Sequence, residues 1–136
     1  MRILLSLAAV ALLAGGVTAA SPAKEDRAAK EAAALEKAIA GKVAGKPQGC
    51  ISLSRARSSQ IIGENAIIYR VSSNAIFVNK PVGGCSGLRK DKTLITRTPG
   101  DRLCSGDIAR VVDLSLGFEG AACVLGEFTP YTKARS

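Results

Sequence analysis

The sequence predicts a mainly β protein of the α+β class, in which an N-terminal helix precedes a small disulfide-stapled antiparallel sheet or barrel. Three observations support this prediction. Residues 21–40 are rich in alanine, glutamate and lysine, which favour helix. From residue 50 onward, short β-branched runs alternate with turn residues. The same part of the chain carries all four cysteines.

Residues 1–20 have the pattern of a secretory signal peptide. Arg2 provides a positive start, residues 3–14 form an apolar run, and small residues follow it. The run is shorter than the ~20 residues that span a bilayer, and no later segment approaches that length. We therefore expect cleavage near Ser21, no transmembrane segment after cleavage, and a periplasmic or secreted product.

Residues 21–41 are expected to form one helix. Ser21 can cap it, Pro22 suits the first helical position, and Gly41 offers a left-handed stop. Its narrow apolar stripe consists of Ala28, Ala32, Leu35 and Ile39. We expect a mostly solvated helix on the flank of the domain, with a partner-binding helix as the alternative.

Residues 42–49 are expected to be a linker between this helix and the rest of the chain. Together with Gly41 they contain three glycines, two lysines and one proline, a composition typical of loops. A β-rich domain is expected over residues 50–131, and residues 132–136 are expected to be a tail.

Six runs in this domain are expected to be strands. They lie at residues 50–53, 66–71, 75–79, 93–97, 108–114 and 123–128. Residues 72–74 and 115–120 should form turns, and the polar residues 54–60 a loop or a short helical turn. The expected core consists of Ile51, Leu53, Ile61, Ile67, Tyr69, Val71, Ile76, Val78, Leu94, Ile108, Val112, Val124, Leu125 and Phe128.

The four cysteines, Cys50, Cys85, Cys104 and Cys123, indicate two disulfides, because their number is even and the chain carries an export signal. Four cysteines allow three pairings. We expect Cys50–Cys123 and Cys85–Cys104, since Cys50 and Cys123 each begin a strand-like run and these runs could lie side by side. Zinc is not expected, because the cysteines are widely spaced and the chain has no histidine.

The absence of histidine excludes the Ser-His-Asp and Cys-His arrangements of nucleophilic catalysis. The stretch 82–90, VGGCSGLRK, lacks the G-x-x-x-x-G-K-[ST] frame of a phosphate loop, and no cofactor is expected. Carboxylates remain, and their simplest interpretation is that they are solvated turn and edge residues. The alternative is a hydrolase that uses Asp107 and Asp113, which requires the two groups to converge with a perturbed pKa.

The chain is basic, with a formal net charge of +8 that becomes +7 when Arg2 is removed with the signal. Such a charge favours anionic partners. Nucleic acid is disfavoured, because an exported protein meets little of it and stacking aromatics are scarce. The predicted anion-binding residues are Arg89, Lys90 and Lys92 of the densest basic run, together with Arg55 and Arg57. The alternative is that these charges only keep a small domain soluble.

Four motifs resemble those of a family of small exported proteobacterial proteins of unknown function. They are CISL at 50–53, CSGL at 85–88, LCSGD at 103–107 and CVLGEF at 123–128. The resemblance covers residues 50–131, and it differs at Ser86, where proline is frequent in the family. It implies export, one domain and paired cysteines, and it implies no activity.

We therefore expect a periplasmic, non-enzymatic binding protein or an envelope-associated accessory domain with a basic surface. Its expected partners are anionic envelope components or another periplasmic protein. Two alternatives stay open besides this one. They are the carboxylate hydrolase described above and a periplasmic inhibitor or assembly subunit, for which a disulfide scaffold is a common framework.

Overall fold

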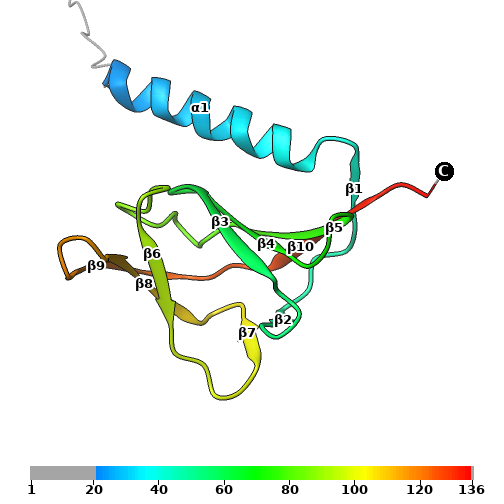
Figure 1. Cartoon of the computed structure of the whole chain (residues 1–136). Coiled ribbons are helices and arrows are strands. Elements are labelled where there is room, and N and C mark those ends of the chain that lie inside the picture. Colours follow the sequence, from blue (N-terminus) through cyan, green and yellow to red (C-terminus); the bar gives the residue numbers. More distant parts are fainter. Residues whose placement is uncertain (1–20, 136) are drawn as a thin grey trace, which may run out of the picture.

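A computed structural model describes residues 21–135 of the chain (Figure 1). The predicted signal peptide and the last residue of the predicted tail lie outside these residues. The described part forms one helix and ten strands. They are α1 (Pro22–Ile39), β1 (Lys42–Ala44), β2 (Cys50–Ser52), β3 (Ser58–Gly63), β4 (Ala66–Arg70), β5 (Ala75–Asn79), β6 (Thr93–Thr96), β7 (Arg102–Cys104), β8 (Ile108–Asp113), β9 (Phe118–Val124) and β10 (Phe128–Lys133).

The strands form three antiparallel sheets. The largest has the order β1-β10-β5-β4-β3, and the two smaller ones are β2-β7 and β6-β8-β9. Helix α1 lies over one face of the five-stranded sheet, and the smaller sheets lie on the opposite face of that sheet (Figure 1). The predicted α+β, mainly β class is therefore confirmed.

Helix α1 begins and ends close to the predicted positions. Pro22 occupies the first turn, and Gly41 has a φ of 70°, a left-handed conformation that glycine adopts without strain. Ser21 makes no side-chain capping bond, although its backbone oxygen accepts a hydrogen bond from Lys24 N at 2.9 Å. Only the second half of the helix packs on the sheet, through Ala34, Leu35, Ala38 and Ile39. Ala28 and Ala32 of the predicted stripe are exposed, so much of the helix is solvated.

Five of the six predicted runs contain a strand, whereas the run at 123–128 is wrong, because β9 ends at Val124, residues 125–127 are not in a strand and β10 begins only at Phe128. The chain also forms strands where none was expected. Residues 42–44 of the predicted linker form β1, which pairs with β10. Residues 58–60, predicted as a loop or helical turn, begin β3. The predicted tail is wrong at its start, because β10 continues to Lys133. These polar segments become strands because a neighbouring strand supplies hydrogen bonds, a tertiary effect that hydrophobic pattern does not reveal.

The predicted turn at residues 72–74 is confirmed. The backbone amides of Val71 and Ser72 both donate to Ala75 O at 3.1 Å, which closes the connection between β4 and β5. The predicted turn at 115–120 is shorter than expected, because β9 already begins at Phe118.

The core lies on both faces of the five-stranded sheet. On the helix side, α1 packs against Ile62, Ala66, Ile68, Ile76 and Val78. On the other side a larger cluster includes Ile67, Tyr69, Leu103, Leu125 and Phe128. Tyr69 and Phe128 meet edge to face at 5.7 Å, and burial raises the pKa of Tyr69 to about 12.

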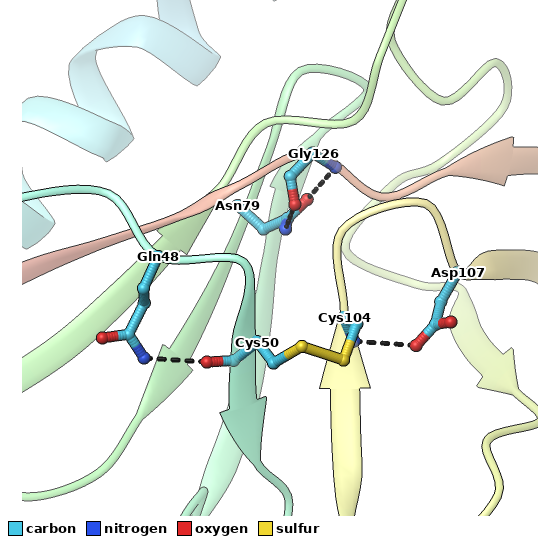
Figure 2. The surroundings of a disulfide bond; sticks show 6 residues. All are labelled: Gln48, Cys50, Asn79, Cys104, Asp107 and Gly126. Carbon is cyan, nitrogen blue, oxygen red and sulfur yellow. Dashed lines mark hydrogen bonds between the residues drawn. A yellow bond between two sulfur atoms is a disulfide. The ribbon is translucent and has the colours of Figure 1, made fainter.

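All four cysteines form disulfides, as predicted, but the predicted pairing is wrong. The bonds are Cys50–Cys104 and Cys85–Cys123. Cys50 cannot pair with Cys123, because β2 lies beside β7, where Cys50 is directly opposite Cys104 with a Cα–Cα distance of 4.0 Å (Figure 2).

Cys123 lies instead on β9, which pairs with β8. A β-bridge between Val82 and Val124 brings the segment that contains Cys85 alongside the end of β9. The two disulfides are compatible with an extracellular or periplasmic protein. In residues 21–135, no helix has the length and apolar character needed to cross a membrane.

Near the Cys50–Cys104 disulfide, the buried side chain of Asn79 connects β5 to the segment between β9 and β10 (Figure 2). Asn79, which is fully buried, donates from Nδ2 to Gly126 O at 2.7 Å and accepts from Gly126 N at 3.2 Å. The amide thus satisfies both backbone groups of Gly126, where the chain passes from β9 to β10. Glycine is required here, because an added Cβ would collide with Lys80 O.

Candidate functional site

The five basic residues predicted as an anion site do not lie together. Arg89 and Lys90 line a groove beside α1, whereas Arg55 lines a pocket on the opposite side of the five-stranded sheet. Arg57 is exposed and lines neither of these cavities. Lys92 is engaged by two carboxylates. Arg89 and Lys90 therefore belong to one surface and Arg55 to another.

The first surface is a basic groove between α1 and the loop that follows β5. Arg27 and Lys30 of the helix face Arg89 and Lys90 of the loop across a cavity of about 300 Å³. Glu31 and Asp91 also line it, so four cations stand against two carboxylates. The helix approaches closely because Gly63 has no side chain, and a Cβ there would collide with the Glu31 carboxylate. The groove carries a positive net charge and is suited to anions.

Ion pairs order the loop on one side of the basic groove. Arg89 Nε lies 3.6 Å from Asp91 Oδ1, and Lys92 Nζ lies 3.1 Å from Asp91 Oδ2. Lys92 Nζ also donates to Asp113 Oδ2. This hydrogen bond lowers the pKa of Asp113 below its usual value and raises the pKa of Lys92. Lys92 therefore anchors the loop, and its charge is already paired with two carboxylates.

An exposed apolar tip lies next to this loop. Leu114, Leu116 and Phe118, which we call the hairpin tip, end the β8–β9 hairpin and are 71%, 79% and 68% exposed. Leu116 and Phe118 line a small cavity together with Lys92. The hairpin projects at the end of the molecule where α1 begins (Figure 1). Large apolar side chains at an exposed tip are unfavourable in water unless another surface covers them.

Hydrogen bonds hold the hairpin tip in place. Asp113 Oδ1 accepts from Ser115 N at 3.0 Å, from Ser115 Oγ at 2.5 Å and from Leu116 N at 3.1 Å. The other oxygen of the same carboxylate accepts from Lys92. One carboxylate therefore connects the turn of the hairpin to Lys92, which lies in the same loop as Arg89 and Lys90.

The carboxylates of the predicted hydrolase do not converge. Asp107 precedes β8 and accepts from Cys104 N at 2.7 Å (Figure 2), whereas Asp113 ends the same strand. Six residues of strand extend about 20 Å, so the two groups lie too far apart to act on one bond. Within residues 21–135, no group of three or more histidine, cysteine, aspartate or glutamate side chains could hold a metal ion.

The second surface is an apolar pocket of about 420 Å³ on the sheet face that points away from α1. Its walls come from β2, β5 and β10, and its residues include Ile51, Ser52, Val71, Ala75, Phe77, Pro130 and Thr132. Arg55 and Arg102 also line it. Sequence reasoning missed this pocket, because it depends on β7 and on the second half of β10, which were not predicted as strands.

Comparisons with known proteins give no relative from which a function could be transferred. No protein-family model, no curated protein sequence and no solved structure matches the chain. The resemblance of its four cysteine motifs to a family of exported proteins therefore stays a prediction.

Proposed function

We propose that the chain is exported to the periplasm, where it acts without enzymatic activity as an accessory protein that binds anionic envelope lipid surfaces. The observation that carries this proposal is the exposed hairpin tip, which the Asp113–Lys92 contact connects to the loop that forms one side of the basic groove. An apolar tip flanked by cations is the arrangement by which peripheral proteins attach to anionic bilayers.

The apolar and the charged parts of this surface contribute in different ways. Burial of apolar side chains in the acyl boundary stabilises the bound state by roughly 25 cal/mol per Å² removed from water. Each lysine or arginine near an anionic leaflet adds about 1 kcal/mol, and salt screens this contribution. The surface offers both contributions, the first from three apolar side chains and the second from Arg27, Lys30, Arg89 and Lys90, and we expect the attachment to be reversible.

Export to the periplasm is supported by two independent features. The first is the pattern of residues 1–20, which is that of a signal peptide. The second is the presence of two disulfides, which form and persist in oxidising compartments. A periplasmic protein with a net charge of +7 meets anionic lipid head groups on both membranes that enclose it.

Vesicle binding by the chain from Ser21 to Ser136 tests this function. Vesicles of phosphatidylcholine with 30% phosphatidylglycerol should bind the protein at 50 mM salt, and pure phosphatidylcholine should bind much less. Arg89→Ala with Lys90→Ala should weaken binding and flatten its salt dependence, because both cations lie in the basic groove. Leu116→Ser with Phe118→Ser should weaken binding at every salt concentration.

Arg57→Ala is the matched control, since it removes an exposed arginine that lies outside the basic groove. It should bind like the unaltered protein. Absence of binding to anionic vesicles at low salt would contradict the proposal. Binding by the tip variant at the unaltered level would also contradict it, and would leave the inhibitor or assembly alternative as the function to examine by capture from periplasmic extract.

A further inference from the structure

The apolar pocket has walls of apolar side chains and two arginines in its lining. Phe77, Pro130 and Ala75 line it on the five-stranded sheet, and Ile51 lines it on β2. Phe77 and Pro130 are directly opposite each other in the pairing of β5 with β10, so they lie on the same face. Arg55 and Arg102 add two guanidinium groups to the lining.

The segments that carry the two arginines are connected by a network around Asp101. Its Oδ2 accepts from Ser52 Oγ at 2.5 Å and from Ser54 Oγ at 2.8 Å, and its Oδ1 accepts from Ser54 N at 2.6 Å. These hydrogen bonds lower the pKa of Asp101 below its usual value. Because Asp101 precedes Arg102 and Ser54 precedes Arg55, the network holds both arginine-bearing segments side by side.

The two guanidinium groups are available to a ligand. In residues 21–135, neither Arg55 nor Arg102 has a carboxylate oxygen within 4.0 Å. The Asp101 carboxylate, which is adjacent to Arg102 in the sequence, is occupied by serine hydroxyls and a backbone amide. Arginine is the side chain best suited to carboxylate and phosphate groups, because its planar fork donates two parallel hydrogen bonds.

We propose that this pocket binds a single-chain amphiphile with an acidic head group. The hydrocarbon chain lies against Phe77, Pro130 and Ala75, and the head group is bound by Arg55 and Arg102. A volume of about 420 Å³ falls in the range of small-ligand sites, which are mostly apolar with a few polar groups that orient the ligand. A wholly polar anion would leave the apolar walls without a partner, and a neutral hydrocarbon would leave both arginines without one.

This site is distinct from the proposed bilayer-binding surface. The apolar pocket lies on the sheet face that points away from α1, whereas the basic groove lies beside α1. Neither surface shares a residue with the other. Failure of vesicle binding would therefore leave the pocket proposal intact, and failure of amphiphile binding would leave the bilayer proposal intact.

Calorimetric titration with dodecanoate below its micellar concentration tests the proposal with the chain from Ser21 to Ser136. We expect saturable binding of one dodecanoate per chain. Arg55→Ala and Arg102→Ala should each weaken binding roughly tenfold, as expected for loss of one charge-assisted hydrogen-bonding partner. Dodecyltrimethylammonium, with the same chain and the opposite charge, should bind at least tenfold more weakly than dodecanoate.

Two variants locate the binding. Ala75→Trp fills the pocket and should abolish binding, and Thr132→Trp places a fluorophore at an exposed pocket residue of a chain that has no tryptophan. Its emission should shift when dodecanoate binds. Arg57→Ala is the matched control and should bind normally. The proposal is overturned if dodecanoate does not bind saturably, if it binds to Ala75→Trp as before, or if Thr132→Trp emission does not respond while binding occurs.

Discussion

The two faces of the five-stranded sheet are covered in different ways. On one face, half of an α-helix packs against five buried residues, and no residue of that helix is itself buried. On the other face, the two small sheets and the segments that connect them pack with the five-stranded sheet to form a cluster of eleven buried residues. Both disulfides and the Asn79–Gly126 hydrogen bonds lie on this second side.

The difference reflects how each cover is formed. A helix satisfies its backbone through local hydrogen bonds, so it needs only a modest apolar contact to stay on the sheet. Strands β2 and β7 have three residues each, and a two-stranded ribbon is at best marginally stable alone. Long-range cross-links are therefore concentrated where the cover cannot stabilise itself. Substitutions on the two faces should accordingly differ in their effect.

The largest effect is expected from removal of a disulfide. Cys50–Cys104 and Cys85–Cys123 join residues that are 54 and 38 positions apart, so the loss of either should lower the free energy of unfolding by about 4 kcal/mol. Cys85→Ala with Cys123→Ala should cost more than Cys50→Ala with Cys104→Ala, because Cys85 and Cys123 are buried. Urea unfolding of both double variants measures this difference.

Mapping of peptides without reduction provides the control for that experiment. The unaltered protein should yield Cys50 linked to Cys104 and Cys85 linked to Cys123. Recovery of Cys50 linked to Cys123 would contradict the register in which β2 pairs with β7.

The next largest loss of stability is expected from removal of the buried Asn79 amide. Asn79→Ala should lower the free energy of unfolding by about 2–3 kcal/mol, because it leaves the buried N–H and C=O of Gly126 without partners. Asn74→Ala, in the exposed turn between β4 and β5, is the control and should change it by no more than about 0.5 kcal/mol. Equal effects of the two substitutions in urea unfolding would argue against a structural role for Asn79.

A smaller effect is expected on the helix face. Leu35→Ala should lower the free energy of unfolding by about 1 kcal/mol, since the side chain is only partly buried against the sheet. Its exposed neighbour Glu36→Ala should have almost no effect. A loss at Leu35 as large as the loss of a disulfide would show that the helix, and not the cross-linked side, is the main source of stability.

The smallest loss of stability is expected for a substitution in the β8–β9 hairpin, and this loss depends on pH. The pKa of Asp113 is lowered in the folded state, so its stabilising contribution is fully present above the unfolded pKa, near 3.8. The contribution is lost as the pH falls through the lower folded pKa. Asp113→Asn should therefore be less stable than the unaltered protein at pH 6, and the difference should shrink below pH 4. A difference that stays constant between pH 6 and pH 3 would contradict this interpretation.

The same contrast explains which parts of the fold were predictable. Helix α1 is specified by neighbouring residues, from Pro22 to Gly41, and the turn at 72–74 is specified by its own polar residues. The sequence also indicated that the cysteines pair. Their partners depend on which strands lie side by side, and β7 was not recognised, so the pairing could not be derived.

The predicted core was wrong at Ile108 and Val124, which are 59% and 41% exposed. These residues are opposite each other in the pairing of β8 with β9, on the outer face of the three-stranded sheet. Their apolar character suggested burial, whereas Ala109 and Val111 of the same strand occupy the core. A shift of one residue in register exchanges the two faces of a strand, so hydrophobicity alone does not decide which face is buried.

The candidate sites also differ in whether they depend on neighbouring residues or on segments that are far apart in the sequence. Arg89 and Lys90 were found from the density of charge in one short run, and that run does lie in a basic groove. Arg55 and Arg102 are 47 residues apart and line one pocket only because β2 pairs with β7. The exposed hairpin tip was missed, because residues 115–120 were predicted only as a turn, and the sequence does not show whether apolar side chains at a turn are covered by another segment.

The sequence by itself determined the helix, the main strand segments, the basic run and the participation of every cysteine in a disulfide, because these depend on composition and on neighbours within a few residues. The tertiary structure alone decided the disulfide partners, the exposure of the hairpin tip and the apolar pocket with its two arginines. The physical reason is that a strand acquires its partners, its buried face and its cavities from segments far away in the chain.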